Sequence, residues 1–190
     1  MSVTSQRVTS REDVRPALLV TAAVGALLLR AWILRTPDAT RIVLLASVYG
    51  AVLAASLMAP VAPDRARLRP AAALWIGLAA VGLAAVASGR PPAVPLGATA
   101  LPLALFAAVA EEALFRRAAY GWLARHGAAV AIAGSALLFA AIHVPLYGPE
   151  AFPVDLGAGL LLSWQRWASG TWTVPAATHA AANLLAVTMR

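Results

Sequence analysis

Long apolar runs, separated by short segments that contain proline, glycine or charge, dominate the chain. A run of about 20 apolar residues forms a helix long enough to cross the roughly 30 Å hydrocarbon layer of a membrane, whereas proline and glycine mark the ends of such helices. On this basis the sequence predicts helices over residues 16–34, 42–59, 71–88, 97–125, 128–146, 156–167 and 172–188.

These runs predict an all-α fold, a polytopic membrane helical bundle with about seven transmembrane helices in a range of six to eight. The range comes from residues 156–167, which are apolar but short, so that they fit a short span, a tilted span or an interfacial segment. The first run is too long for the apolar part of a signal peptide and no Ala-x-Ala-type site follows it, so we expect an uncleaved helix.

Composition also points to a membrane protein. Hydrophobic residues make up 61% of the chain and charged residues 12%, and the mean hydropathy is +0.77; the apolar share exceeds that of soluble domains. The sequence contains no lysine, so arginine supplies all 15 of the Lys and Arg positive charges, which with eight acidic residues leave a net charge of +7. These arginines lie at the ends of apolar runs, so we interpret them as topology signals and expect no nucleic-acid partner. The absence of cysteine excludes disulfides, cysteine–zinc sites and thiol catalysis.

The arginines predict an orientation in the cell membrane. Most of them lie in the tail, in residues 60–70 and at Arg125 and Arg166, which share one side if the helices alternate in direction. Cytoplasmic loops are enriched in arginine, so we expect a multi-pass protein with a cytoplasmic amino terminus. Arg30, near the end of the first run, is expected to extend its side chain to the interface.

A small set of ionisable residues falls at membrane depth, and such residues are functional candidates by default. They are Glu111, Glu112, Arg116, His143 and His179. Glu112 and Arg116 are four residues apart, the spacing of a helical ion pair, so a structural pair and a catalytic role are both open. Each histidine, taken alone, fits a packing role equally well.

Depth matching favours a shared site. The helix that carries Glu111 and the helix that follows meet at Gly127 in what must be a short antiparallel hairpin. Glu111 lies sixteen residues before Gly127 and His143 lies sixteen residues after it, so both sit about 24 Å along their helices from the turn. We therefore expect Glu111 and His143 to face each other, with Phe139 one turn away on the same face.

The last helix carries a second polar pair. His179 and Asn183 are four residues apart and project to one side of their helix. An asparagine in a membrane helix can simply bond to a neighbouring helix, but its pairing with a histidine favours a shared site.

This set of residues supports hydrolysis without a covalent nucleophile. A carboxylate in an apolar pocket can act as a general base, so Glu111 with His143 could hold and deprotonate a water molecule. His179 and Asn183 could donate hydrogen bonds to the oxyanion that forms when this water attacks a carbonyl.

Glu112, neutralised by Arg116, would orient the other side chains of this candidate site. Alternatively, Glu111, His143 and His179 could ligate Zn²⁺, because three ligands and an open position make a known catalytic zinc site. The helical His-Glu-x-x-His pattern is absent, so spacing does not decide for a metal, and zinc is the one cofactor left open.

Three motifs on successive helices carry a resemblance to a known family. Residues 111–116 match Glu-Glu-x-x-x-Arg, residues 139–143 match Phe-x-x-x-His, and residues 179–183 match His-x-x-x-Asn. Together they resemble the CAAX protease and bacteriocin-processing (CPBP, or Abi) family of intramembrane proteases. The resemblance covers residue 96 to the carboxyl end.

The resemblance implies roles for the matching residues. Glu111 is implied to be the base and His143 to hold the water, with His179 and Asn183 at the oxyanion and with Glu112 and Arg116 in support. Family members have been described both as metalloproteases and as glutamate proteases, so the metal stays open. Arg117 departs from the family, which usually has glycine there, and this puts close helix packing at that point in doubt.

The sequence thus predicts three parts: a polar tail over residues 1–15, three transmembrane helices over 16–95, and a catalytic CPBP-like core over 96–190. We expect an intramembrane endopeptidase that uses a glutamate-activated water to cleave membrane-associated peptides or the carboxyl-terminal tails of membrane-associated proteins. The bilayer and such a peptide or protein substrate are the expected partners. Two alternatives remain open: a non-catalytic immunity or scaffold protein that binds a peptide in the same pocket, and an ion or proton carrier.

Overall fold

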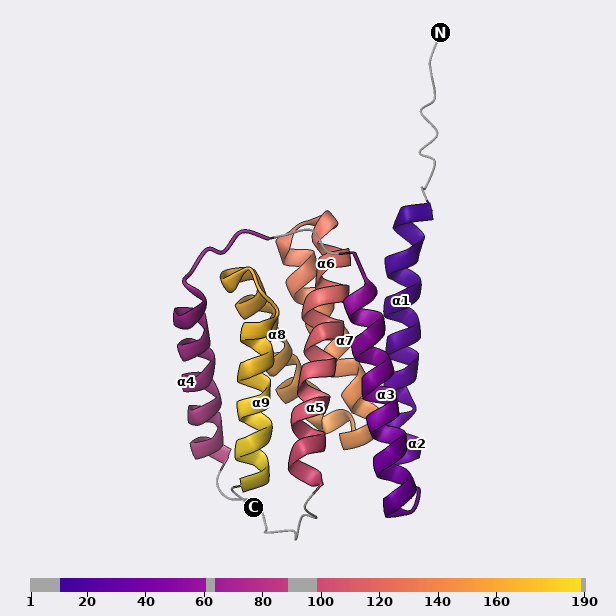
Figure 1. Cartoon of the computed structure of the whole chain (residues 1–190). Helices are drawn as coiled ribbons and strands as arrows, with labels where there is room; N and C mark the ends of the chain where they lie inside the picture. The colour runs from indigo at the N-terminus through magenta and orange to yellow at the C-terminus, as the bar shows by residue number, and fades with distance from the viewer. Residues whose placement is uncertain (1–10, 61–63, 89–98, 189–190) are drawn as a thin grey trace.

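A computed structural model describes residues 11–60, 64–88 and 99–188. All regular elements in these ranges are helical, which confirms the all-α fold, and the helices lie side by side (Figure 1). The α-helices are α1 Arg11–Leu28, α2 Arg30–Ile33, α3 Asp38–Met58, α4 Pro70–Ser88, α5 Ala100–Glu112, α6 Tyr120–Leu123, α7 Ala128–Tyr147, α8 Phe152–Ser169 and α9 Thr173–Thr188.

In the described ranges these elements group into seven helical segments, in line with the predicted number, because α1 leads directly into α2 and α5 leads through a π-helix into α6. Four stretches of them are long and apolar enough to cross a membrane: Arg15–Ile33, Ala39–Met58, Pro70–Ala87 and Ala128–Tyr147. The segment that was expected to be short, residues 156–167, lies within an 18-residue helix, α8.

Local sequence explains where the helices begin and end. Gly127, Gly148 and Gly170 have φ angles of 102°, 86° and 70° and follow helical segments, as expected for glycine in the left-handed region. Pro70 is the first residue of α4, a position where a missing backbone N–H leaves no hydrogen bond unmade.

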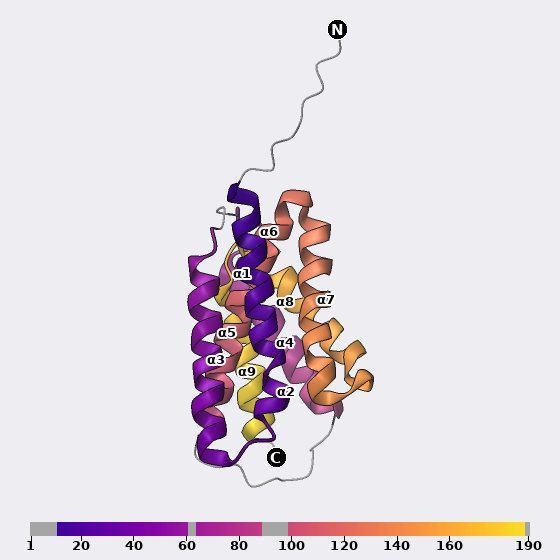
Figure 2. The same cartoon turned by 90° about the vertical axis from the view of Figure 1, so that its right-hand side faces the viewer.

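The centre of the molecule is α5, which packs against α3 on one side and α9 on the other, while α4 covers the outer side of α9 (Figure 1). Turning the molecule shows α7 and α8 forming the other layer, where they pack closely on each other (Figure 2). On α4, Trp75, Leu83 and Val86 are exposed, as lipid-facing side chains would be. The central position of α5 places its carboxyl end, with Glu111 and Glu112, inside the bundle.

The helix expected over residues 97–125 is not uniformly α-helical. Residues 97 and 98 lie outside the described residues, and Ala113–Ala119 form a π-helix. A π-helical turn shifts the hydrogen-bond pattern by one residue and occurs often at functional sites. Here the carbonyl oxygen of Arg116 accepts a hydrogen bond from Nε of Arg166 on α8, at 3.0 Å.

The two ends of the bundle differ. The start of α1, the end of α3, the start of α4, the turn into α7 and the turn between α8 and α9 lie at one end, which we call the amino-terminal end (Figure 1). The end of α2, the start of α5, the end of α7 and the end of α9 lie at the opposite end (Figure 1). Successive helices thus alternate in direction, and the prediction of a cytoplasmic amino terminus assumed this alternation.

Candidate active site

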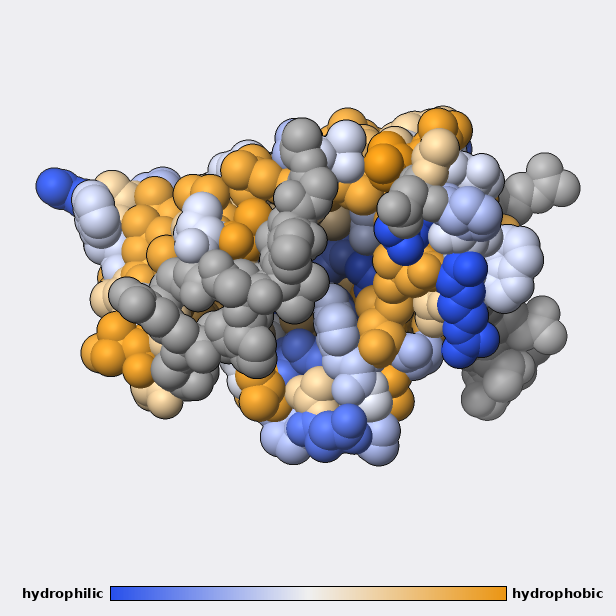
Figure 3. Space-filling view, turned by 90° about the horizontal axis from the view of Figure 1, so that it is seen from below, coloured by the Kyte–Doolittle hydropathy of each residue, from blue (hydrophilic) through white to orange (hydrophobic). Residues whose placement is uncertain are grey.

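Four of the predicted site residues line a single cavity. It has a volume of about 650 Å³, and Glu111, His143, His179 and Asn183 all line it. Its lining also includes Leu34, Arg41, Thr99 and Val187, so the cavity extends to the opposite end of the bundle. Seen from that end, hydrophilic side chains lie in the depth of a hollow (Figure 3).

Glu111 and His143 face each other across this cavity, as the hairpin predicted. Oε2 of Glu111 is 3.7 Å from Nε2 of His143. Nδ1 of His143 is 2.7 Å from the carbonyl oxygen of Phe139, and because a carbonyl only accepts, Nδ1 carries the hydrogen. Nε2 of the neutral ring is therefore an acceptor directed at Glu111. A separation of 3.7 Å is too long for a direct hydrogen bond.

Arg30 is a charged site residue that sequence reasoning missed. Its side chain is buried, with 4% of the residue exposed, and Nη1 donates to Oε1 of Glu111. Nη1 also lies 3.5 Å from the hydroxyl of Tyr49 on α3. The expectation that Arg30 extends to the interface is wrong, because an unpaired carboxylate inside the bundle would cost several kcal/mol and attracts the guanidinium inward. The signal available in the sequence was a single charge inside the first apolar run.

Glu112 and Arg116 lie behind the cavity and line no part of it. Both are fully buried, and Oε2 of Glu112 is 3.1 Å from Nε of Arg116, so the predicted pair is present. Nη2 of Arg116 donates to the carbonyl oxygen of Gly159 on α8, at 3.1 Å. Arg116 thereby joins the π-helix to α8 through both its side chain and its main-chain carbonyl.

His179 connects this buried pair to the cavity. Its Nδ1 donates to Oε1 of Glu112 at 2.9 Å, a contact that the sequence did not predict. The other ring nitrogen, Nε2, can therefore donate to a ligand only when the ring carries both protons. Asn183, one turn further on, donates from Nδ2 to the carbonyl oxygen of Ala104 at 2.9 Å, which fixes its amide beside His179.

Aromatic rings hold the two histidines in place. The ring of Phe139 lies 4.5 Å from that of His143 and 5.7 Å from that of His179, between centroids. The guanidinium of Arg116 lies 4.6 Å from the centroid of the Phe139 ring. Tyr147 stacks on His143 with an interplanar angle of 10°. Phe139 is thus on the predicted face, whereas Tyr147 was not foreseen.

Arg117, the departure from the family pattern, has a structural partner. Its Nη1 donates to the carbonyl oxygens of Ser56 and Ala59, the latter at 3.0 Å. These carbonyls lie at the end of α3, where the last backbone acceptors of a helix lack partners within it. The long side chain therefore bridges two helices at a point where glycine would allow closer packing.

The zinc alternative requires Glu111, His143 and His179 to converge. Among the residues that the structure describes, no three His, Asp or Glu side chains are grouped closely enough to hold a metal ion. The carboxylate of Glu111 is bound to Arg30, and Nδ1 of His179 is bound to Glu112. This arrangement does not fit a three-ligand site, and the metal stays a prediction for experiment.

The carboxyl-terminal part of the chain matches the model of a known protein family. Residues 93–185 match the family model described as Type II CAAX prenyl endopeptidase Rce1-like. Over this range the chain is similar to the Rce1-like CAAX proteases. The search of curated proteins and the search of solved structures each found no match. The matched range contains all three motifs, whereas Arg30 and Tyr49 lie outside it. Family and apolar helices together indicate a membrane protein of a peptidase family.

Proposed function

We propose that this protein is an intramembrane endopeptidase in which Glu111 activates the attacking water. The observation that carries the proposal is the pairing of Glu111 with the acceptor nitrogen of His143, 3.7 Å apart on the wall of a cavity inside the helices. A water between them would donate one hydrogen to each. The ring of His143 is held in the required tautomer by Phe139.

The remaining residues supply the other parts of the reaction. The water oxygen attacks the peptide carbonyl carbon while its proton passes to Glu111, and the carbonyl oxygen becomes an oxyanion. Nε2 of doubly protonated His179 and the amide of Asn183 would donate to this oxyanion. The proton on Glu111 then passes to the leaving nitrogen as the C–N bond breaks. Glu112 and Arg116 are positioning residues, since they act through His179.

Arg30 gives Glu111 a fixed orientation. The guanidinium binds Oε1, and Oε2 is the oxygen that faces His143. Oε1 of Glu111 is thus held by Arg30, and Oε2 is left to bind the water. This division is the arrangement that a general base needs, because the reacting oxygen must lie within hydrogen-bond reach of the water.

We further propose a multi-pass arrangement in the cell membrane with the amino terminus in the cytoplasm. The arginines at the amino-terminal end of the bundle support it. In this orientation the cavity extends to the non-cytoplasmic end, so substrates would approach from that side. Membrane-anchored peptides or tails whose scissile bond lies near that surface are the substrates that fit.

The direct test is Glu111→Gln in purified protein presented with a library of membrane-anchored reporter peptides. Cleavage, followed by mass spectrometry, should fall below detection while the protein remains folded. Glu150→Gln makes the same chemical change at an exposed position and should cleave like the wild type. Full activity of the Glu111→Gln protein would disprove the mechanism. Metal analysis and a chelator added to the same assay decide between glutamate and metal chemistry, with activity expected to survive chelation.

A non-catalytic protein that only binds a peptide would use the same pocket, and the ion pair between Arg30 and Glu111 is equally compatible with it. A binding or immunity protein should retain peptide binding in the Glu111→Gln variant and release no product from the wild type. The same assay therefore separates the two functions.

A further inference from the structure

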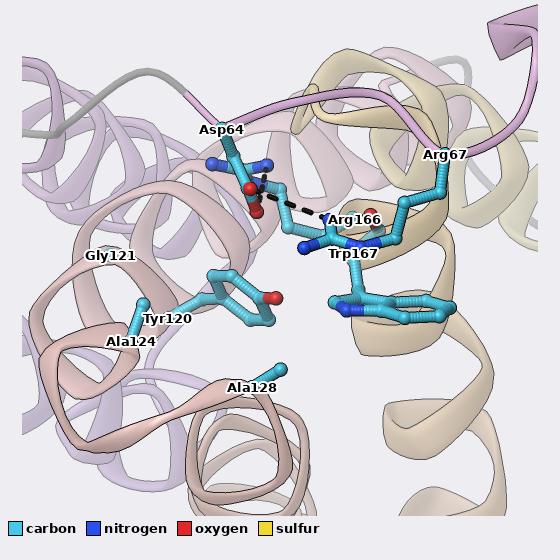
Figure 4. A pocket seen from close by; sticks show the side chains of 8 residues that line it. All are labelled: Asp64, Arg67, Tyr120, Gly121, Ala124, Ala128, Arg166 and Trp167. Atoms are coloured by element: carbon cyan, nitrogen blue, oxygen red, sulfur yellow. Dashed lines mark hydrogen bonds and ion pairs between the residues drawn. The ribbon is translucent and has the colours of Figure 1, made fainter.

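A second cavity lies at the amino-terminal end of the bundle, and none of its lining residues lines the first cavity. Its volume is about 200 Å³. Asp64 and Arg67 reach it from the segment between α3 and α4, Tyr120 from α6, and Arg166 and Trp167 from the end of α8 (Figure 4). These side chains come from three separate parts of the chain and surround one space.

Arg166 is built into this cavity. Only 4% of the residue is exposed, and Nε is fixed by its hydrogen bond to the carbonyl oxygen of Arg116. The guanidinium lies 5.1 Å from the centroid of the Tyr120 ring. Nη1 has no hydrogen-bond partner in the described residues and has only a loose ion pair, 3.6 Å from Oδ2 of Asp64. A buried, immobilised guanidinium with an unmade bond is a prepared anion site.

Arg67 brings a second guanidinium to the same space. It lies over the ring of Trp167, 4.6 Å from the centroid, and Nη1 donates to the Trp167 carbonyl oxygen at 2.9 Å. Its distance to Oδ1 of Asp64 is 3.4 Å. Charge-assisted hydrogen bonds are typically about 2.7–2.9 Å long, so Asp64 satisfies neither arginine fully. The cavity therefore carries a net positive charge.

The position of the cavity indicates where its ligand comes from. The amino-terminal end also carries Arg65, Arg69 and Arg125, which are exposed. Arginine and tryptophan at the ends of apolar helices mark the interface between membrane and water, where phosphate head groups lie. Each guanidinium keeps N–H donors beyond those bonded to main-chain carbonyls, and phosphate, with its several acceptor oxygens, is a group that the arginine fork matches.

We propose that this cavity binds a phosphate group between Arg67 and Arg166, carried by an anionic phospholipid head group or free in solution. The proposal rests on the placement of this end at the membrane surface and does not depend on proteolysis. When the anion binds, Asp64 gives up its two loose ion pairs and turns towards water. Arg166 does not need to move, because its Nε remains on Arg116.

The test uses the full chain in nanodiscs of phosphatidylcholine, alone, with phosphatidylglycerol added, or with inorganic phosphate matched in ionic strength against chloride. Lipid retained by the protein is counted by native mass spectrometry, and phosphate binding is followed by the thermal unfolding midpoint. We expect wild-type protein to retain one phosphatidylglycerol or to gain thermal stability with phosphate, and the two arms distinguish the two sources.

Three variants decide whether this cavity is the site. Arg67→Gln should weaken binding about tenfold, since one charge-assisted hydrogen bond is worth about a factor of ten. Arg65→Gln removes the same charge from the same segment outside the cavity and should bind like the wild type. Asp64→Asn removes the competing carboxylate and should strengthen binding. Equal binding by Arg67→Gln and Arg65→Gln, weaker binding by Asp64→Asn, or no anion bound by the wild type would overturn the proposal.

Discussion

Arg30 and Glu111 form an ion pair inside the bundle although they are 81 residues apart in the sequence. Their side chains are 5% and 4% exposed. Arg30 belongs to the amino-terminal helices, outside the range that matches the family model. The amino-terminal helices therefore contribute a side chain to the candidate site and do more than surround the family core.

Breaking the ion pair between Arg30 and Glu111 should lower the free energy of unfolding, and a double variant can show that the two side chains are coupled. Arg30→Gln leaves Glu111 as a buried, uncompensated charge, so the free energy of unfolding should fall by roughly 3–5 kcal/mol. Combining Arg30→Gln with Glu111→Gln removes both charges and should recover much of that loss. Thermal unfolding of the single and double variants measures the coupling. Additive effects would show that the pair contributes nothing as a unit. Arg35→Gln, at an exposed position, serves as the control.

Glu112 should affect turnover through His179 without touching the substrate. Glu112→Gln keeps an oxygen that can accept from Nδ1 but removes the charge that favours the doubly protonated ring. We expect kcat to fall by about 10- to 100-fold, less than the roughly 100- to 1,000-fold lost when an oxyanion donor is removed outright, with KM nearly unchanged. Steady-state kinetics on any substrate from the peptide library checks this. A change confined to KM would instead assign Glu112 a binding role. Because the variant also leaves the buried guanidinium of Arg116 without its carboxylate partner, rates are compared per amount of folded protein.

Close packing of α8 on α7 depends on one of two glycines in α8. A Cβ at Gly159 would lie 3.0 Å from the Cα and the carbonyl oxygen of Ala136, whereas a Cβ at Gly157 would meet nothing within 4 Å. Gly159→Ala should therefore destabilise the protein by about 1–3 kcal/mol. Gly157→Ala should be neutral or stabilising by about 0.5–1 kcal/mol, because alanine is the better helix former. Thermal unfolding of both variants gives the comparison, and equal midpoints would contradict the packing of these helices.

The orientation of the cavity can be tested by chemical labelling, because the chain has no cysteine of its own. Arg35 and Arg125 are exposed at opposite ends of the bundle. In intact cells, a membrane-impermeant maleimide should label Arg35→Cys and should not label Arg125→Cys until the membrane is permeabilised. The reverse pattern would place the amino terminus outside and the cavity on the cytoplasmic side.

Much of the fold could be predicted from the sequence because helices in apolar surroundings are specified locally. The lengths of the apolar runs, the glycines between them and Pro70 gave helices close to those observed. The hairpin at Gly127 also fixed the relative depth of Glu111 and His143, since equal spacing from a turn is a local property of two helices. The three family motifs also contain Glu111, His143, His179 and Asn183, which line the cavity.

Other features depend on contacts between helices that are distant in sequence, and only the tertiary structure decided them. Arg30 turned inward because Glu111 was there to receive it, and His179 bound Glu112 because α9 packs on α5. The same holds for the π-helix, for the close approach of Gly159 to Ala136 and for the cavity that Arg67 and Arg166 both line. Periodicity and spacing describe one helix or one hairpin at a time, whereas the partner of a buried charge is chosen by the whole bundle.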